Sequence, residues 1–482
     1  MPLISIEFGL FFIAFLGLYW SAARSPRLQN LLLLVASLAW LYSVSDWFTA
    51  SVALFTGAVW MFAAVIARSE DRSRRFWLGA GTGAAVGYLA FCKYYDFFRP
   101  ALRECFGGAA ADVLMPLGIS YYTFQGIAYL VAVYRNEHER LGAFNLFLLF
   151  SSFLTVTSGP IARSAPFKTL EGTVPGMASQ LTSPEPRRIL KPALAVTLIA
   201  LGVLKKWWLA GLLGDHVVNP VFENPQQLDA ASIVAGLYGY TAQLFFDFSG
   251  YSDLVIGAGL LLGLRLPLNF MQPLRAGNLR DFWSRWHITL STWIRDFIYI
   301  PLGGSRGGYW RTQVNLVLTM VLSGLWHGYG LTFGLWGLMH GLGLVVLNLF
   351  DRARGMTRER RKALAKAKPW GTFWGRLLTL HFVVLAFVVF RANSLGDVAL
   401  IFEALATPEC WTGPFEKTGL WALGLLAAAW LAYPLIDRAV RGFTALLERL
   451  PSAFWPVPLA AVLLVAYYLA PSGVPGFLYA NF

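Results

Sequence analysis

Charged residues are scarce in this chain: only 13% of its 482 residues are Asp, Glu, Lys or Arg. A soluble domain carries about 25% of them, whereas 57% of the residues here are hydrophobic. The composition therefore excludes an ordinary soluble protein and predicts a polytopic membrane protein. Strand-like alternation and fixed-period repeats are also lacking, so we expect an all-α fold.

Patterns that would hold a metal, a disulfide framework or a nucleotide are lacking as well. Three scattered cysteines, without any C-x-x-C, support neither a disulfide framework nor a cysteine zinc site. The six histidines form no H-x-x-x-H or H-x-x-E pair, which excludes the usual metal-site spacings. The glycines of residues 302–308 are not followed by Gly-Lys-Ser or Gly-Lys-Thr, as a P-loop requires. We expect no permanently bound cofactor.

The net charge of +13 is spread through the loops between apolar runs. Positive loops that face a cytoplasm explain this distribution better than nucleic-acid binding does. Residues 351–368 carry eight Lys or Arg against two acidic residues, so we predict a basic cytoplasmic loop there. A surface helix on anionic membrane lipid and a solvated loop fit this segment equally well.

The apolar runs predict about 11–13 membrane segments in a single integral membrane domain, residues 1–482. Residues 401–482 supply its C-terminal membrane helices. The run 230–264 is too long for one span and rich in glycine, so it is expected to break. The run 189–213 carries two lysines in its middle, which predicts a helix to about Leu204 and then a basic interfacial joint.

Residues 244–329 hold ionisable groups that stand among apolar residues, including Asp247, Asp253 and two of the six histidines. Charged groups at membrane depth are costly and mark pathways or reactive sites. Paired charges that brace a helix bundle are an equally good interpretation of the two aspartates, Arg285 and Arg295.

Residues 278–297 separate on a helical wheel into an apolar arc and a polar arc, with Asn278 as the expected N-cap and Pro301 preventing continuation. We therefore predict one continuous amphipathic helix. It lies along a membrane interface as an anchor, or its polar arc lines a wet cavity. His287 falls at the boundary between the arcs, within reach of both water and a buried substrate.

His327 stands at the end of an apolar run, between Trp326 and Gly328. A neutral imidazole, with an ordinary pKa of about 6.5, can act as a general base at neutral pH. A hydrogen-bonded core histidine is the alternative. His340 follows 13 residues later, about 220° around a continuous helix. It need not share a face with His327, and its substitution is expected to retain most activity.

Several motifs together closely resemble the membrane-bound O-acyltransferase family, in particular its bacterial polysaccharide branch of alginate O-acetyltransferases. The resemblance runs from about residue 28 to about residue 400, with the catalytic motifs in 244–329. The motifs are Phe246-Asp247-Phe248-Ser249-Gly250-Tyr251-Ser252-Asp253, Phe282-Trp283-x-Arg285-Trp286-His287-Ile288, Tyr299-Ile300-Pro301-Leu302-Gly303-Gly304 and Trp326-His327-Gly328.

The resemblance implies a helical bundle with re-entrant and interfacial helices around a central funnel through which acyl groups pass. It implies that His327 is the catalytic histidine and His287 the second active-site residue. Further substrate-binding or tunnel-lining candidates are Trp326, Asp247, Ser249, Asp253, Arg285, Ser291 and Arg295. It also implies an acetyl donor that is a cytoplasmic thioester, most simply acetyl-CoA, and an exported alginate-like or cellulose-like polysaccharide as acceptor.

The resemblance further implies a bacterial inner-membrane location and an extracytoplasmic SGNH-type partner, an acetyltransferase or esterase-like protein. No nucleophile elbow surrounds a serine or cysteine, so direct transfer is favoured over an acyl-enzyme. Two alternatives stay open. One is transfer of an aminoacyl (D-alanyl) group to a cell-wall polymer, and the other is a transporter or flippase without chemistry, because broken helices and buried charges also suit transport.

Overall fold

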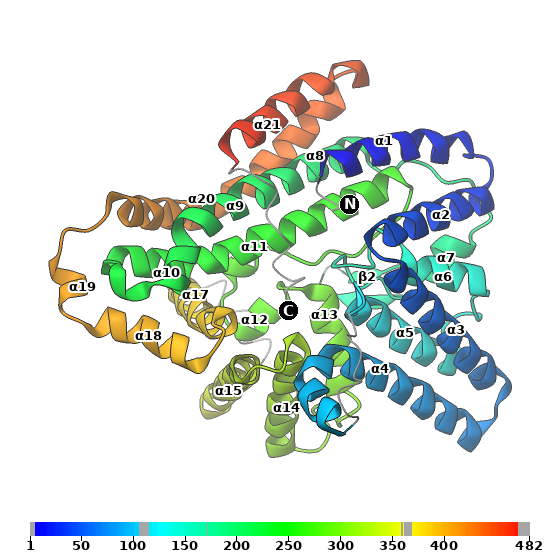
Figure 1. The fold of residues 1–482 in the computed structure, drawn as a ribbon, viewed down its shortest axis with the longest axis horizontal. Helices are drawn as coiled ribbons and strands as arrows, with labels where there is room; N and C mark the ends of the chain where they lie inside the picture. Colours follow the sequence, from blue (N-terminus) through cyan, green and yellow to red (C-terminus); the bar gives the residue numbers. More distant parts are fainter. Residues whose placement is uncertain (1–4, 106–114, 171, 358–359, 361–368, 471–482) are drawn as a thin grey trace. The chain divides into compact units, whose positions relative to one another are not determined.

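The computed structural model describes residues 5–105, 115–170, 172–357, 360 and 369–470 (Figure 1). The chain forms two compact units, residues 1–199 with 251–268 and residues 200–250 with 269–482. Helices make up most of the described chain, which confirms the all-α prediction. Its only strands are a two-stranded antiparallel pair in the first unit, β1 (Phe167–Thr169) and β2 (Gly172–Val174).

Eight helices in the described residues are long and apolar enough to cross a membrane. This confirms a polytopic membrane protein. The predicted total of about 11–13 segments also counted shorter apolar runs, which the structure builds as helices such as α1 (Ile6–Ser21) and α5 (Ile119–Tyr134). The eight are Pro26–Val44, Asp46–Arg68, Pro192–Glu223, Ala230–Leu261, Leu331–Ala353, Thr372–Arg391, Lys417–Arg449 and Ser452–Leu469.

The first unit holds the amino-terminal helices, and one half-buried arginine ties three of its segments together. Arg187 Nη1 donates to the Tyr19 hydroxyl at 2.8 Å and Arg187 Nη2 donates to Asn30 Oδ1 at 2.6 Å. The Tyr19 hydroxyl in turn donates to the Leu262 carbonyl at 2.9 Å. Bonds from a charged donor are the stronger kind. Besides α1 and α5, the unit contains α2 (Pro26–Val44), α3 (Asp46–Arg68), α4 (Asp71–Cys105), α6 (Ala143–Ser151) and α7 (Met177–Thr182).

The second unit contains both candidate catalytic histidines. Two helices run from one unit into the other, α8 (Pro192–Val203) and α11 (Ala230–Leu261). The remaining elements of the second unit are η1 (Leu204–Ala210), α9 (Gly211–Leu213), η2 (Gly214–Val218), α10 (Asn219–Glu223), η3 (Pro225–Gln227), η4 (Pro273–Arg275), α12 (Leu279–Trp283), α13 (Ile288–Ile294), η5 (Arg295–Tyr299), α14 (Tyr309–His327), α15 (Leu331–Ala353), α17 (Pro369–Arg391), α18 (Leu395–Ala406), α19 (Glu409–Thr412), α20 (Lys417–Arg449), η6 (Ser452–Phe454) and α21 (Pro456–Leu469).

The expected break in 230–264 is wrong, because α11 is continuous over 32 residues. Its glycines serve close packing instead. A Cβ on Gly236 would lie 2.4 Å from Val221 Cγ2, and one on Gly250 would lie 2.9 Å from the Gly202 carbonyl oxygen. Small residues that let two backbones approach are typical of membrane helix contacts.

The predicted interfacial joint at the two lysines is also wrong. The chain continues helically through them as a π-helical turn, η1, and Lys206 is only 2% exposed. Its ammonium group forms an ion pair with Asp247 of α11. A buried partner of opposite charge therefore explains why this lysine stands inside an apolar run.

The basic loop predicted at 351–368 falls largely outside the described residues, which omit 358–359 and 361–368. Its first residues complete α15, which ends at Ala353. The cytoplasmic orientation of this loop stays a prediction.

Candidate active site

A glycine-rich helical hairpin, α14 followed by α15, carries His327 (Figure 1). A Cβ on Gly324 would lie 2.2 Å from the Phe333 carbonyl oxygen, and one on Gly337 would lie 2.4 Å from the Met320 carbonyl oxygen. Any larger residue would therefore push the two helices apart. The hairpin brings residues of α15 against the end of α14 where His327 lies.

His327 is the last residue of α14 and is 3% exposed. Its ring centroid lies 4.5 Å from that of Trp326, 5.3 Å from that of Trp336 and 4.9 Å from that of Phe390. A residue larger than glycine would not fit at position 328, because a Cβ there would lie 2.5 Å from the Phe333 ring. The imidazole is thus enclosed by aromatic side chains rather than by the small residues next to it in sequence.

His287 lies in a break in the predicted amphipathic helix. The structure has two short helices, α12 and α13, and His287 stands before α13 with φ 41°. The prediction of one continuous helix over 278–297 is therefore wrong. A left-handed backbone at a residue other than glycine is strained and persists only where its surroundings impose it, commonly at functional sites.

The surroundings that impose this break come from the preceding loop. The Ile288 N–H donates to the Asn269 carbonyl at 2.9 Å, and the Thr289 hydroxyl donates to Asn269 Oδ1 at 2.6 Å. Two residues on, the Met271 N–H donates to the Arg285 carbonyl at 3.0 Å. The Ile288 N–H and the Arg285 carbonyl are backbone groups that a continuous helix would pair internally.

α13 is buried on both arcs of the predicted wheel. Trp293 of the apolar arc is 4% exposed, and Thr292 of the polar arc is 8% exposed. The interpretation of this segment as an interfacial anchor helix is therefore wrong. His287 is 1% exposed, and burial lowers its pKa to about 3, so its imidazole is neutral.

One aromatic network in the second unit reaches both histidines. At one end, the His287 ring lies 4.6 Å from that of Phe248, at 88° to it. At the other end, Phe390 contacts His327. The links between them are Phe248–Phe270 at 5.0 Å, Phe270–Trp286 at 5.1 Å, Trp286–Phe387 at 5.2 Å and Phe387–Phe390 at 6.1 Å. The structure thus brings the two predicted catalytic residues into a single packed core.

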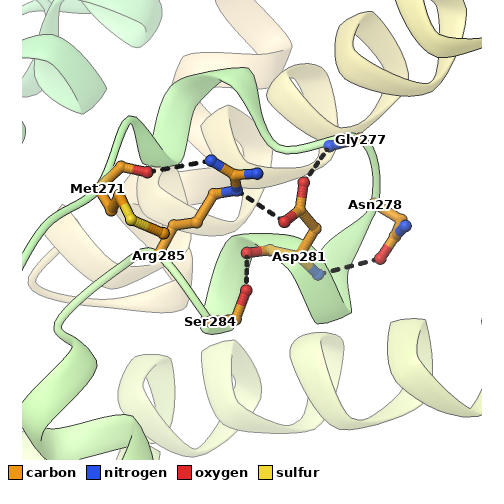
Figure 2. Close-up of polar contacts among 6 residues, drawn as sticks. All are labelled: Met271, Gly277, Asn278, Asp281, Ser284 and Arg285. Atoms are coloured by element: carbon orange, nitrogen blue, oxygen red, sulfur yellow. Dashed lines mark hydrogen bonds and ion pairs between the residues drawn. The ribbon is translucent and has the colours of Figure 1, made fainter. Parts of the chain in front are cut away.

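Arg285 stabilises the turn between α12 and His287 (Figure 2). Its Nε donates to Asp281 Oδ1 at 2.6 Å, and its Nη1 donates to the Met271 carbonyl at 3.3 Å. Asp281 Oδ2 also accepts from the Gly277 N–H at 3.0 Å, and Asn278 caps α12 through the Asp281 N–H, as predicted. Arg285 therefore has a structural task, and contact with substrate stays a prediction.

The remaining candidates lie in varied surroundings. Asp247 is paired with Lys206, and Ser249, two residues further along α11, is 2% exposed. Asp253 lies half-buried in the first unit, roughly 240° around α11 from Asp247. The Ser291 hydroxyl donates to the Trp286 carbonyl at 3.0 Å, and the exposed Arg295 pairs with its half-buried neighbour Asp296 at 2.7 Å. Their proposed roles in binding stay predictions.

Sequence reasoning missed Trp336, which packs against His327, and the buried partner of Asp247. A signal for the tryptophan was present, because Trp336-Gly337 and His340-Gly341 place two ring side chains and two small residues at helical i, i+4 spacing on α15. Only the hairpin turn at residues 328–330 shows that this face meets His327.

We expect that replacing Asp281 with asparagine destabilises the turn before His287. The carboxylate accepts from a guanidinium and from a backbone N–H, and bonds to charged groups contribute about 1.5–3 kcal/mol. Thermal unfolding of the purified protein in detergent measures the loss. Ser284→Ala is the control: its hydroxyl bonds only to the Asp281 carbonyl among described groups, and the expected change is within about 0.5 kcal/mol. Equal losses of thermal stability from both variants would contradict a stabilising role of the Asp281 carboxylate in this turn.

The fold and the buried histidines define a class of membrane enzyme, and the comparison with known proteins agrees. Residues 134–374, which include both histidines, match the family model of MBOAT, the membrane-bound O-acyltransferase family. The chain belongs to this family and is a polytopic membrane O-acyltransferase. The resemblance seen in the motifs is confirmed.

Several relatives are named as enzymes that modify a polymer. The chain is 35% identical to the probable alginate O-acetylase AlgI of Pseudomonas aeruginosa over 421 residues, which cover 83% of this chain and 74% of the relative. It is 31% identical to the peptidoglycan O-acetyltransferase of Helicobacter pylori over 82% of this chain and 77% of that one. It is 30% identical to the teichoic acid D-alanyltransferase of Bacillus subtilis over 58% of this chain and 69% of the relative.

Proposed function

We propose that this enzyme moves an acetyl group from a cytoplasmic thioester, most simply acetyl-CoA, for O-acetylation of an exported alginate-like or cellulose-like polysaccharide. The observation that carries the proposal is the position of His327, which is buried among aromatic rings at the end of α14. The chain is also similar to a probable alginate O-acetylase over four-fifths of its length.

In this mechanism His327 is the general base. As the acceptor hydroxyl oxygen attacks the thioester carbonyl carbon, the imidazole takes the hydroxyl proton. The carbon–sulfur bond then breaks, and the thiolate receives that proton. Proton transfer by a positioned side chain contributes about 10²–10⁴-fold in rate. His287, neutral and held in a strained turn, positions the reacting groups.

The bacterial inner membrane is the proposed location, with the basic segment 351–368 toward the cytoplasm and the donor. The proposal includes an extracytoplasmic SGNH-type partner that completes transfer to the polymer.

Transfer of a D-alanyl group is the second candidate, because the chain is also similar to teichoic acid D-alanyltransferases. Family membership favours either chemistry over a transporter without chemistry.

Donor choice tests the proposal directly. Inverted membrane vesicles that contain the enzyme, its proposed partner and the polymer would be given radiolabelled acetyl-CoA, or a radiolabelled D-alanyl carrier protein. We expect label on the polymer from acetyl-CoA alone. Label from the D-alanyl carrier alone would overturn the proposal in favour of the second candidate.

A further inference from the structure

Three rings of the second unit form a compact group beside His327, which we call the ring triad: Trp283, Trp336 and His340. The centroids of Trp283 and Trp336 lie 5.7 Å apart, and each lies 5.0 Å from that of His340. Trp283 ends α12, whereas the other two are four residues apart on α15. His340 is 0% exposed and Trp336 is 2% exposed.

The ring triad carries buried polar atoms that the described chain does not satisfy. Among the residues that the structure describes, no group hydrogen-bonds to the Nε1 of either tryptophan or to either ring nitrogen of His340. Buried polar atoms in proteins are nearly always paired, and leaving them unpaired destabilises the fold. Aromatic neighbours enclose His340, with Phe282 at 6.2 Å and Phe382 at 5.4 Å. A phenylalanine would suit these neighbours better than a histidine, so packing does not account for the imidazole.

The ring triad adjoins the candidate base, because Trp336 contacts both His340 and His327. The expectation that His340 is dispensable assumed one helix running from His327 through His340. The chain instead turns back between α14 and α15, which places the two histidines on either side of one tryptophan. The geometry on which that expectation was based is therefore not the geometry of the structure.

The chemistry of the ring triad selects the kind of group that would bind it. An indole N–H is a donor only, and a neutral imidazole donates through one of its nitrogens. The complementary group is an acceptor such as a carbonyl oxygen, which has two lone pairs. A thioester donor built on pantetheine, in coenzyme A or on a carrier protein, has an amide carbonyl a few bonds from its sulfur.

We propose that the ring triad binds an amide carbonyl of the donor's pantetheine arm while the thioester carbonyl lies at His327. The inference rests on the proposed function, since it requires a thioester donor. It assigns the arm, rather than the acyl group or the nucleotide, as the part of the donor that His340, Trp283 and Trp336 recognise.

The test is equilibrium binding of S-acetonyl-CoA, a thioether that cannot transfer its acyl group, to the purified full-length protein in detergent. His340→Phe fills the same space without polar atoms and is expected to weaken binding about tenfold. His340→Gln, which keeps polar atoms, should recover part of the affinity. Trp283→Phe, which loses the indole N–H together with the five-membered part of the ring, should weaken binding as well and decides the matter if the first variant does not fold.

His381→Phe is the matched control, because His381 is an exposed residue of α17 whose Nδ1 bonds to the Leu377 carbonyl. It should bind as the wild type does. If the wild type binds and both ring-triad variants bind equally well, the inference alone is overturned. If the wild type does not bind, the proposed donor is wrong and the inference falls with it. Repeating the titration with S-acetonyl-pantetheine separates the two sources: binding with the same dependence on His340 shows that the arm is recognised without the nucleotide.

Discussion

Replacing His327 with glutamine is expected to abolish acetylation of the exported polymer while the protein remains inserted at near-normal abundance. Glutamine has a similar reach and still hydrogen-bonds, but it cannot accept a proton at neutral pH. A loss of about 10²–10⁴-fold in rate would bring transfer close to the limit of detection. The measurement is the acetyl ester content of the polysaccharide, normalised to the immunoblotted protein.

His327→Ala should be equally inactive but is a less sharp test. The ring packs against Trp336 and Phe390, so alanine also leaves a gap in an aromatic core. His381→Gln is the matched control, since it makes the same change at an exposed position and should retain activity. His287→Ala should be impaired to a smaller extent. Substantial acetylation by His327→Gln would exclude the imidazole as the base and return His327 to a structural role.

The class of fold follows from composition, whereas the helix ends around His287 do not. A long apolar run must become a helix in a membrane because only a helix satisfies its own backbone there. The turn before α13 depends instead on Asn269, which bonds to the backbone of Ile288 and to the side chain of Thr289. A helical wheel considers only residues within one segment. It therefore cannot show that a residue of the preceding loop takes a hydrogen bond that the helix would otherwise form.

The motifs predict which histidine is catalytic, and that role stays a prediction, whereas the aromatic surroundings of His327 could not be predicted. Trp336 and Phe390 lie 9 and 63 residues beyond His327 in the sequence. Trp336 contacts it because α15 folds back after the turn at residues 328–330, and Phe390 contacts it from α17. In the sequence, the glycines next to His327 suggested free space beside its ring. In the structure, the space next to Gly328 is filled by Phe333.

Breaking the buried ion pair between Lys206 and Asp247 is expected to destabilise the protein strongly. Their side chains are 3% and 1% exposed. Removing one partner leaves a charge buried without its counterion, which costs about 3–5 kcal/mol. Asp247→Asn and Lys206→Met should each lower the free energy of unfolding by this amount, measured by denaturation of the purified protein in detergent.

The double variant Lys206→Met with Asp247→Leu separates the ion pair from the packing around it. Replacing both charges with apolar groups removes the burial of charge altogether, and such exchanges are often neutral or stabilising by about 1–4 kcal/mol. The double variant should therefore be more stable than either single one, and the cycle yields the coupling between the residues. Lys205→Met is the control, because Lys205 is only half-buried and its ammonium lies 5.6 Å from the Phe245 ring. If the single variants unfold like the wild type, the two groups do not form a charged pair in the protein, and the lysine inside this apolar run would need another explanation.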